Sequence, residues 1–188
     1  MRKNQTALLM ASLLGLSALA VALCAGMVFA ADVTTPPAVG ATAPDFTLPS
    51  ESGANVSLHD FKGKWVVLYF YPKDFTTGCT IEAHGFQTDL AKYQAIKTEI
   101  VGVSVDSTDS HKDFCAKEGL NFKLLSDTKH EVVAQYGSVK DATPNSVALR
   151  NTFIVNPQGK IAKVFLAVQP TKHSAEVLEG LSELQKAK

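Results

Sequence analysis

Cysteine and arginine are scarce in this sequence of 188 residues, and its charges cancel. It has three cysteines, and its 18 Lys and Arg residues balance 18 Asp and Glu residues to a formal net charge of zero. Proteins that bind nucleic acid neutralise its phosphates with Lys and Arg, so a chain without a basic surplus is not expected to bind it. Internal repeats and low-complexity blocks are also missing, which favours an ordinary folded domain.

The first 30 residues have the pattern of a secretory signal peptide. A short cationic start, Met1–Asn4, precedes an apolar stretch of small residues at 7–29, and Ala30 ends a small-residue cleavage site. We therefore predict that residues 1–30 are removed on export and that the protein is periplasmic or otherwise extracytoplasmic. The apolar stretch is also long enough to span a bilayer, so the alternative is an uncleaved membrane anchor.

Removal of this segment would leave 158 residues, the usual size of a single domain. Residues 31–43 are rich in Ala, Thr, Pro and Gly and are predicted to be a flexible leader, so the domain is expected at 44–188. The shortened chain keeps two cysteines, Cys79 and Cys115, and one arginine, Arg150. Two cysteines in an exported protein commonly form a structural disulfide, which is the plainest interpretation of this pair.

A buried strand and a helix are predicted on either side of Pro72. Residues 65–71 are continuously apolar, as in a central strand that is buried on both faces of a mostly parallel sheet. Thr76 or Thr77 can cap a helix that follows, and Cys79 then lies in its first turn. Apolar residues continue along one face of this helix at Phe86, Leu90 and Tyr93. The unpaired N–H groups and the dipole of a helix start favour the thiolate, which is the nucleophilic form of cysteine.

The remaining elements complete an α/β domain. Residues 100–105 are predicted as a second buried strand, so strand, helix and strand make a right-handed crossover. Residues 46–48 and 55–58 can pair as a short N-terminal hairpin. Further elements are predicted as helices at 108–118, 130–136 and 174–186 and as strands at 122–125, 147–155 and 160–168. This order predicts a thioredoxin-like fold, in which a central mixed β-sheet is flanked by helices and extended by the N-terminal β-hairpin.

The segment around Cys79 resembles the active site of a known enzyme family. Pro72-x-x-x-Thr76-x-x-Cys79 resembles the peroxiredoxin signature, and the residues around it are similar to the peroxiredoxin Q group, also called bacterioferritin comigratory proteins. Further matches are Val39-Gly40-x-x-Ala43-Pro44-Asp45-Phe46-x-Leu48 and Arg150-x-Thr152-Phe153-Ile154-Val155. The resemblance implies a thioredoxin-like fold and a thiol-dependent peroxidase that reduces hydrogen peroxide and organic hydroperoxides.

The resemblance also implies a role for each matched residue. Cys79 corresponds to the peroxidatic cysteine, Thr76 to the hydroxyl that hydrogen-bonds it and the peroxide, and Pro72 to the residue that shields the pocket. Arg150 corresponds to the catalytic arginine. A permanently charged guanidinium suits that role, because it stabilises both the thiolate and the charge that develops as the O–O bond breaks. The alternative for Arg150 is an ordinary surface salt bridge.

Many peroxiredoxin Q proteins carry a second cysteine five residues after the first. In this sequence that position is His84. Cys115 matches instead the resolving cysteine of members that carry it on the next helix, so the resemblance implies a disulfide between Cys79 and Cys115. Two intact helices are expected to hold these thiols too far apart, so the first turn of the Cys79 helix should unwind in each cycle. The alternatives are a buried spectator thiol at Cys115 and a His84 that either assists proton transfer or is merely solvated.

Two other functions are considered for an exported thioredoxin-like fold. A thiol-disulfide exchanger needs Cys-x-x-Cys at the helix start, and Thr76 stands at the first of these positions. A protein that binds copper or another soft metal can use Cys79, His84 and Cys115 as ligands, although their spacing matches no closed metal site. The peroxidase is favoured over both. It implies no cofactor or metal, a peroxide substrate, a thioredoxin-like or other dithiol reductant, and a monomer.

Overall fold

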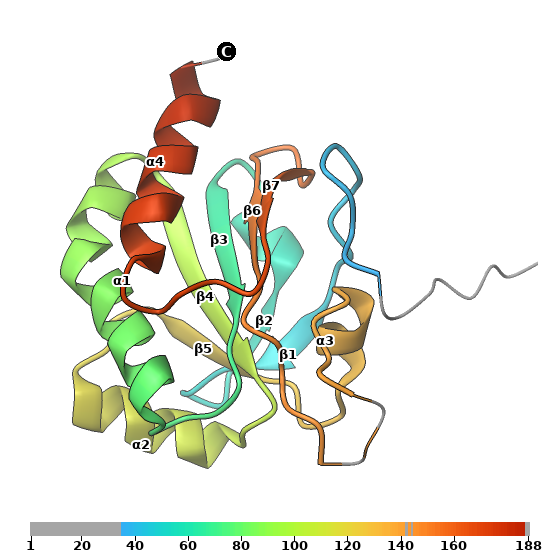
Figure 1. Ribbon diagram of the computed structural model, residues 1–188, viewed down its shortest axis with the longest axis vertical. Coiled ribbons are helices and arrows are strands. Elements are labelled where there is room, and N and C mark those ends of the chain that lie inside the picture. Colours follow the sequence, from blue (N-terminus) through green and yellow to red (C-terminus); the bar gives the residue numbers. More distant parts are fainter. Residues whose placement is uncertain (1–34, 142, 144, 187–188) are drawn as a thin grey trace, which may run out of the picture.

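The computed structural model describes residues 35–186 except residues 142 and 144, and these residues form one α/β sheet domain (Figure 1). The strands are β1 (Thr47–Pro49), β2 (Asn55–Ser57), β3 (Trp65–Phe70), β4 (Thr98–Ser104), β5 (Lys123–Ser126), β6 (Thr152–Val155) and β7 (Ile161–Phe165). The helices are the 3-10 turn η1 (Leu58–Phe61) and the α-helices α1 (Thr77–Ala95), α2 (Thr108–Glu118), α3 (Glu131–Gln135) and α4 (His173–Lys186). The predicted signal peptide lies outside the described residues.

Strand β3 is the centre of a five-stranded sheet with the order β5-β4-β3-β6-β7. It pairs in parallel with β4 and antiparallel with β6, so that Val67 has Ile100 on one side and Ile154 on the other. All six of its side chains are buried, as the continuous apolar sequence predicts. The thioredoxin-like mixed sheet and the N-terminal hairpin of β1 and β2 are therefore confirmed.

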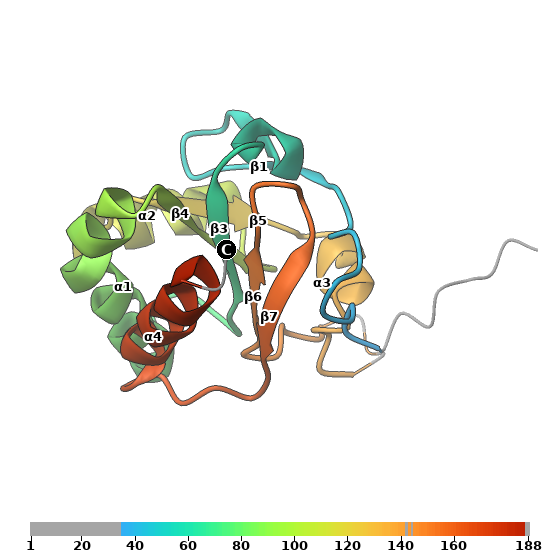
Figure 2. The ribbon, with the colours of Figure 1, turned by 90° about the horizontal axis from the view of Figure 1, so that it is seen from above.

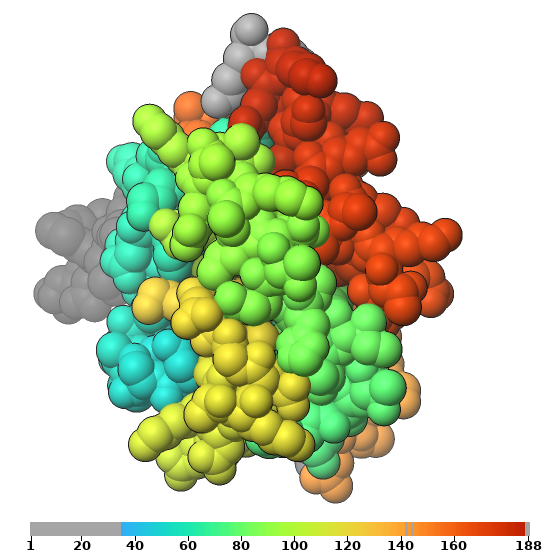
Figure 3. Space-filling model, turned by 90° about the vertical axis from the view of Figure 1, so that its left-hand side faces the viewer, coloured from blue at the N-terminus to red at the C-terminus, as the bar shows by residue number. Residues whose placement is uncertain are grey.

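Helices cover both faces of this sheet. Figure 1 and Figure 2 show α1, α2 and α4 on one face and α3 on the other. Side chains alternate along β3, so Val67 and Tyr69 enter the core beneath α1 and α4, whereas Leu68 and Phe70 enter the core shared with α3 and the hairpin. The space-filling view in Figure 3 looks onto the outer surface of α1 and α2, with α4 above them.

The C-terminal hairpin is shorter than the sequence predicts. Residues 147–151 do not belong to β6, and residues 147–149 pair instead with the segment after α3, where Leu149 N donates to Ser138 O at 2.6 Å. At the other end, β7 stops at Phe165, two residues before Ala167. Ala167 has a left-handed φ of 49°, which an extended strand does not accommodate. The residues just before β6 and after β7 are therefore free to turn toward α1.

The expected leader also differs from the structure in its described part. Residues 40–43 were predicted to be flexible, but they lie along the start of β7, where Gly40 N donates to Ile161 O at 2.8 Å and Ile161 N donates to Ala41 O at 2.9 Å. Gly137 lies against the chain just before them, because a Cβ on it would lie 2.4 Å from Pro36 N. Backbone pairing therefore fixes a segment whose composition suggested mobility.

Candidate active site

Cys79 lies in the first turn of α1 at the carboxyl end of β3. Thr76 is the N-cap residue, and the first intrahelical hydrogen bond runs from Thr80 N to Thr76 O at 2.9 Å. The N–H groups of residues 77–79 therefore have no partner within the helix. Cys79 is 2% exposed, so its sulfur faces the interior at the positive end of a helix.

Thr76 occupies the predicted N-cap position, but its side chain does not cap the helix. Its hydroxyl donates instead to Lys73 O at 2.9 Å, which tightens the loop between Pro72 and α1. A hydroxyl that has donated its proton still has lone pairs and can accept a hydrogen bond. Pro72 is half-buried just after β3. Tyr71 N donates to Val103 O, but Pro72 has no N–H and cannot continue this pairing.

Arg150 meets the sulfur of Cys79. Its Nη2 donates to Cys79 Sγ at 3.5 Å. Arg150 lies in the bend before β6, and its carbonyl accepts from Val168 N at 3.0 Å, so the bend is held by the chain that leaves β7. The structure thus brings Cys79 and Arg150 together, 71 residues apart in the sequence.

Glu82 and His173 complete the site and were not predicted as functional residues. Arg150 Nη1 forms an ion pair with Glu82, whose second carboxylate oxygen lies 2.7 Å from His173 Nδ1. Glu82 and His173 are both buried. Burial lowers the pKa of Arg150, but the carboxylate of Glu82 and the sulfur of Cys79 outweigh it and hold that pKa above its ordinary value. Glu82 is three residues after Cys79 on the same helix face, a spacing that could have indicated it.

Gly78 allows the guanidinium to approach α1. A Cβ at this position would lie 3.2 Å from Arg150 Nη2 and 3.6 Å from Pro170 Cγ. The first of these separations is tighter than ordinary van der Waals contact, so any side chain here would press on the group that contacts the sulfur.

Cys115 lies on α2 and is half-buried beside the same apolar cluster that contains Cys79. Both cysteines are free thiols, which rules out a structural disulfide in this form of the protein. Burial, and to a smaller extent the carboxylates of Glu51 and Asp74, raise the pKa of the Cys115 thiol to about 12. Cys115 is therefore a poor nucleophile while it stays where the structure places it.

His84 is on α1, where its Nε2 lies 2.9 Å from Glu118 Oε2 at the end of α2. It thus joins the two helices rather than standing alone in solvent. Within residues 35–186, no three His, Cys, Asp or Glu side chains gather as a metal ion would require. In the same part of the chain, no helix is both long and apolar enough to cross a membrane.

Comparison with known proteins agrees with this geometry. Residues 39–164 match the AhpC/TSA family. The putative peroxiredoxin bcp of Coxiella burnetii is 42% identical over 147 residues, which cover 76% of this chain and 97% of that protein. The chain belongs to the peroxiredoxin family. A crystal structure of a mutant PrxQ from Xylella fastidiosa is 31% identical with a TM-score of 0.74, and the match covers 79% of this chain and 98% of that one.

A third relative is the bacterioferritin comigratory protein of Xanthomonas campestris, whose solved structure is 32% identical with a TM-score of 0.69 over 73% of this chain and 90% of that one. Its structure is described in terms of alkyl peroxide reduction activity. These relatives place the chain in the peroxiredoxin Q group, as its motifs predict, and it is a thiol-dependent peroxidase. The thiol-disulfide exchanger and the soft-metal protein are not favoured.

We predict that Gly78→Ala lowers the rate of reaction with peroxide roughly tenfold, because a displacement of Arg150 misplaces the group beside the sulfur. The fold should not suffer, since Ala is favoured over Gly inside a helix by about 1 kcal/mol. Gly85→Ala is the matched control on the same helix, because its Cβ would make only an ordinary 3.6 Å contact with Ser174. Peroxide consumption and thermal unfolding of both variants test this, and equal activity in the two would contradict it.

Proposed function

We propose that Cys79 is the peroxidatic residue and that its contact with Arg150 carries the reaction. The Cys79 thiolate attacks one peroxide oxygen, the O–O bond breaks, and the leaving oxygen takes a proton to depart as water or an alcohol. Cys79 is left as a sulfenic acid. The observation that supports this most directly is the 3.5 Å contact between Arg150 Nη2 and Cys79 Sγ at a helix start.

The surrounding residues suit the same step. The guanidinium has several donors, so Arg150 can hold the thiolate and the departing oxygen together while Glu82 keeps it in place. In this proposal the Thr76 hydroxyl, whose proton is given to Lys73 O, accepts a hydrogen bond from the peroxide and orients it. Pro72 adds an apolar wall where a backbone N–H would bind water.

Cys115 is proposed as the resolving cysteine. Its sulfur attacks the sulfenic acid of Cys79, a disulfide forms, the S–O bond breaks, and the thiol proton leaves with the hydroxyl as water. Both thiols border one apolar cluster, which supports the pairing. A disulfide requires Cα atoms about 4.4 to 6.8 Å apart, so the proposal includes local unwinding at the start of α1. Helix ends open at low cost, because few packed contacts are lost there.

The substrates are proposed to be hydrogen peroxide and organic hydroperoxides. Phe75 and Ile81 are large apolar side chains that remain exposed close to Cys79 in the sequence, which suits an alkyl group, and the Xanthomonas relative is described as acting on alkyl peroxides. A thioredoxin-like or other dithiol donor would return the disulfide to two thiols and become oxidised itself. We propose that the enzyme works as a monomer, because both cysteines of this scheme belong to one chain.

Export is part of the proposal. The AhpC/TSA match begins at residue 39, so the cationic and apolar segment of residues 1–30 precedes the family domain. Its pattern supports a signal peptide that delivers the enzyme to the periplasm or another extracytoplasmic space.

Cys79→Ser should abolish peroxide reduction, and Arg150→Lys should slow it about a hundredfold, since lysine keeps the charge but lacks the planar fork that reaches both Glu82 and Cys79. Second-order rate constants with hydrogen peroxide provide the measurement, with circular dichroism to confirm folding. Near-normal turnover in folded Cys79→Ser would remove this thiol from the mechanism.

One equivalent of peroxide should convert the reduced protein to a monomer two mass units lighter, with Cys79 linked to Cys115 on peptide mapping. Cys115→Ser should still reduce the first equivalent but accumulate sulfenic acid and then over-oxidise. Mass spectrometry under non-reducing conditions distinguishes these species. A disulfide only between two chains, or normal cycling of Cys115→Ser with a dithiol donor, would argue against the proposed resolving role.

N-terminal sequencing of exported protein should give a chain that begins at Ala31. The control is the same measurement after replacement of the cationic residues Arg2 and Lys3, which should delay export. A membrane-bound chain that still begins at Met1 would show an anchor instead.

A further inference from the structure

His173 is a buried histidine next to the active site that the peroxidase chemistry does not use directly. It begins α4, its side chain is fully buried, and its Nδ1 lies 2.7 Å from Glu82 Oε1. The other ring nitrogen, Nε2, is buried and has no hydrogen-bond partner among the described residues. The rings of Phe86 on α1 and Phe165 on β7 lie edge-on to it, with centroids 5.0 and 6.3 Å away. One ring nitrogen therefore meets a carboxylate, and the other lies in the aromatic core.

These surroundings favour one form of the imidazole ring. The carboxylate of Glu82 accepts hydrogen bonds, so the 2.7 Å contact requires a proton on Nδ1 of His173. A second proton on Nε2 would create a charged ring with a buried donor that no described group accepts, which costs more than an unused lone pair. The arrangement therefore favours a neutral ring that is protonated at Nδ1 alone.

The start of α4 is fixed on α1 by contacts that do not involve the imidazole. Tyr93 Oη donates to Ser174 O at 2.8 Å, and Ser174 Oγ donates to Asp89 Oδ2 at 2.8 Å. Tyr93 and Asp89 both belong to α1. The hydrogen bond of His173 is therefore not needed to dock this helix, and a buried polar ring at this position calls for another explanation.

The contacts of His173 continue to the active-site sulfur through two further side chains. Glu82 uses Oε1 for His173 and Oε2 for Arg150 Nη1. Arg150 in turn uses Nη2 for Cys79 Sγ, at 3.5 Å. A carboxylate held by one oxygen can still turn, whereas one held at both oxygens has a fixed plane. The hydrogen bond from His173 thus fixes the orientation in which Glu82 directs the guanidinium toward the sulfur.

We propose that His173 is a positioning residue for the reaction with peroxide. It holds Glu82 so that Arg150 presents its second nitrogen to the sulfur and to the departing oxygen. The inference rests on the proposed roles of Cys79 and Arg150. Without the donor on His173, Oε1 of Glu82 would lie unpaired in the aromatic core, so the carboxylate would turn away or take up a proton. Either change leaves the guanidinium without its fixed direction, and peroxide reduction slows.

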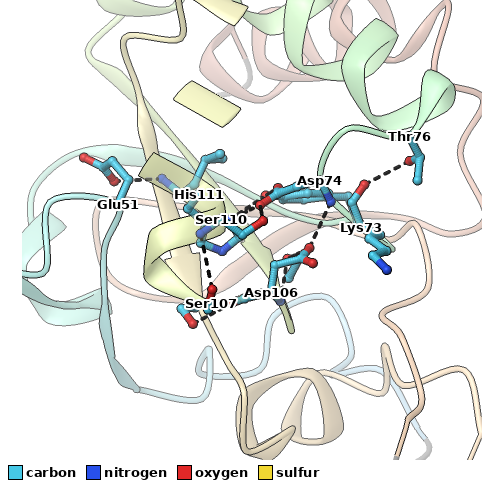
Figure 4. Close-up of polar contacts among 12 residues, drawn as sticks. Glu51, Lys73, Asp74, Thr76, Asp106, Ser107, Ser110 and His111 are labelled. Atoms are coloured by element: carbon cyan, nitrogen blue, oxygen red, sulfur yellow. Dashed lines mark hydrogen bonds and ion pairs between the residues drawn. The ribbon is translucent and has the colours of Figure 1, made fainter. Parts of the chain in front are cut away.

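A second buried histidine provides a matched control. His111 on α2 is also fully buried, its Nδ1 lies 2.8 Å from Asp74 Oδ2, and its Nε2 likewise has no partner among the described residues. Asp74 also accepts from Tyr71 Oη and Ser110 Oγ, both at 2.7 Å, and Figure 4 shows Ser110 and His111 beside it. None of these contacts involves the guanidinium. The two histidines therefore make the same kind of hydrogen bond, but only one of them leads to the reacting sulfur.

The test compares His173→Leu, His173→Asn and the control His111→Leu in the full-length enzyme. Leucine keeps an apolar side chain against the aromatic rings but has no donor, whereas the amide of asparagine can donate near the position of Nδ1. Quenched-flow mass spectrometry gives the rate constant for oxidation of Cys79 by hydrogen peroxide. We expect a loss of about thirtyfold in His173→Leu and of no more than about threefold in His173→Asn and in His111→Leu.

Alkylation of Cys79 by iodoacetamide separates positioning from damage to the fold. This reaction needs an accessible thiolate but no donor for a departing peroxide oxygen. Because the charge of Arg150 remains in the site, alkylation of His173→Leu should stay within about threefold of wild type on peptide mapping. A loosened fold would instead expose the sulfur of Cys79, which is 2% exposed, and would accelerate alkylation.

Nitrogen-15 NMR of the reduced wild-type enzyme tests the same contact without a substitution. At neutral pH the imidazole of His173 should carry a proton on Nδ1 and none on Nε2. A proton on Nε2 would overturn the proposal, so a failure of His173→Leu to fold does not protect it.

The kinetic outcomes are equally decisive. Wild-type peroxide reduction by folded His173→Leu would overturn the proposal, and so would an equal loss in His111→Leu, a failure of His173→Asn to restore the rate, or a change in alkylation as large as that in peroxide reduction. If folded Cys79→Ser still reduces peroxide, the proposed function fails first. An inactive Cys79→Ser beside a fully active His173→Leu removes the role of His173 alone, so the two failures are distinguishable.

Discussion

The buried ion pair of Arg150 and Glu82 is the interaction on which the active site depends. Glu82 is held inside the protein, where a lone carboxylate would be strongly unfavourable, and Arg150 and His173 satisfy its two oxygens. Loss of one partner from a buried pair typically costs about 3–5 kcal/mol, because the other charge is left uncompensated. The same pair fixes the guanidinium so that its remaining nitrogen meets Cys79. In the proposed mechanism, the contacts that stabilise the buried carboxylate also position the guanidinium beside the sulfur.

The fold explains how these residues meet. Cys79 and Glu82 lie on the first turns of α1, which follows the carboxyl end of β3. Arg150 lies in the bend before β6, and His173 lies at the start of α4. Because β6 is antiparallel to β3, its first residues lie at the edge of the sheet where β3 ends. The early end of β6 and of β7 lets the chain turn there toward α1. Had the strands continued as far as the sequence suggests, Arg150 would be fixed within the sheet.

Hydrophobic periodicity and helix-capping residues predicted the strand and the helix that hold Cys79. The continuous apolar run of β3, the helix start at Thr76 and the place of Cys79 in its first turn all follow from propensity and periodicity. Contacts over long sequence distances could not be found in that way. Glu82 lies only three residues after Cys79, but its partner His173 lies 91 residues from it. Thr76 occupies the N-cap position, yet its hydroxyl donates a hydrogen bond to Lys73 O. This hydrogen bond depends on the folded conformation of the loop, which the sequence pattern does not give.

Two demands on the same few residues explain why the loop before α1 is built from unlike interactions. In the proposed mechanism, attack on peroxide needs Cys79 held against Arg150, whereas resolution by Cys115 needs the start of α1 to unwind. Asp74 supplies directional hydrogen bonds that either form or break, and Phe75 supplies an apolar contact on a strained backbone. Strain at Phe75 is tolerated only while its ring packs on Phe114, so loss of either contact weakens the other. The proposed mechanism asks this loop to hold Cys79 for attack on peroxide and to release it for resolution.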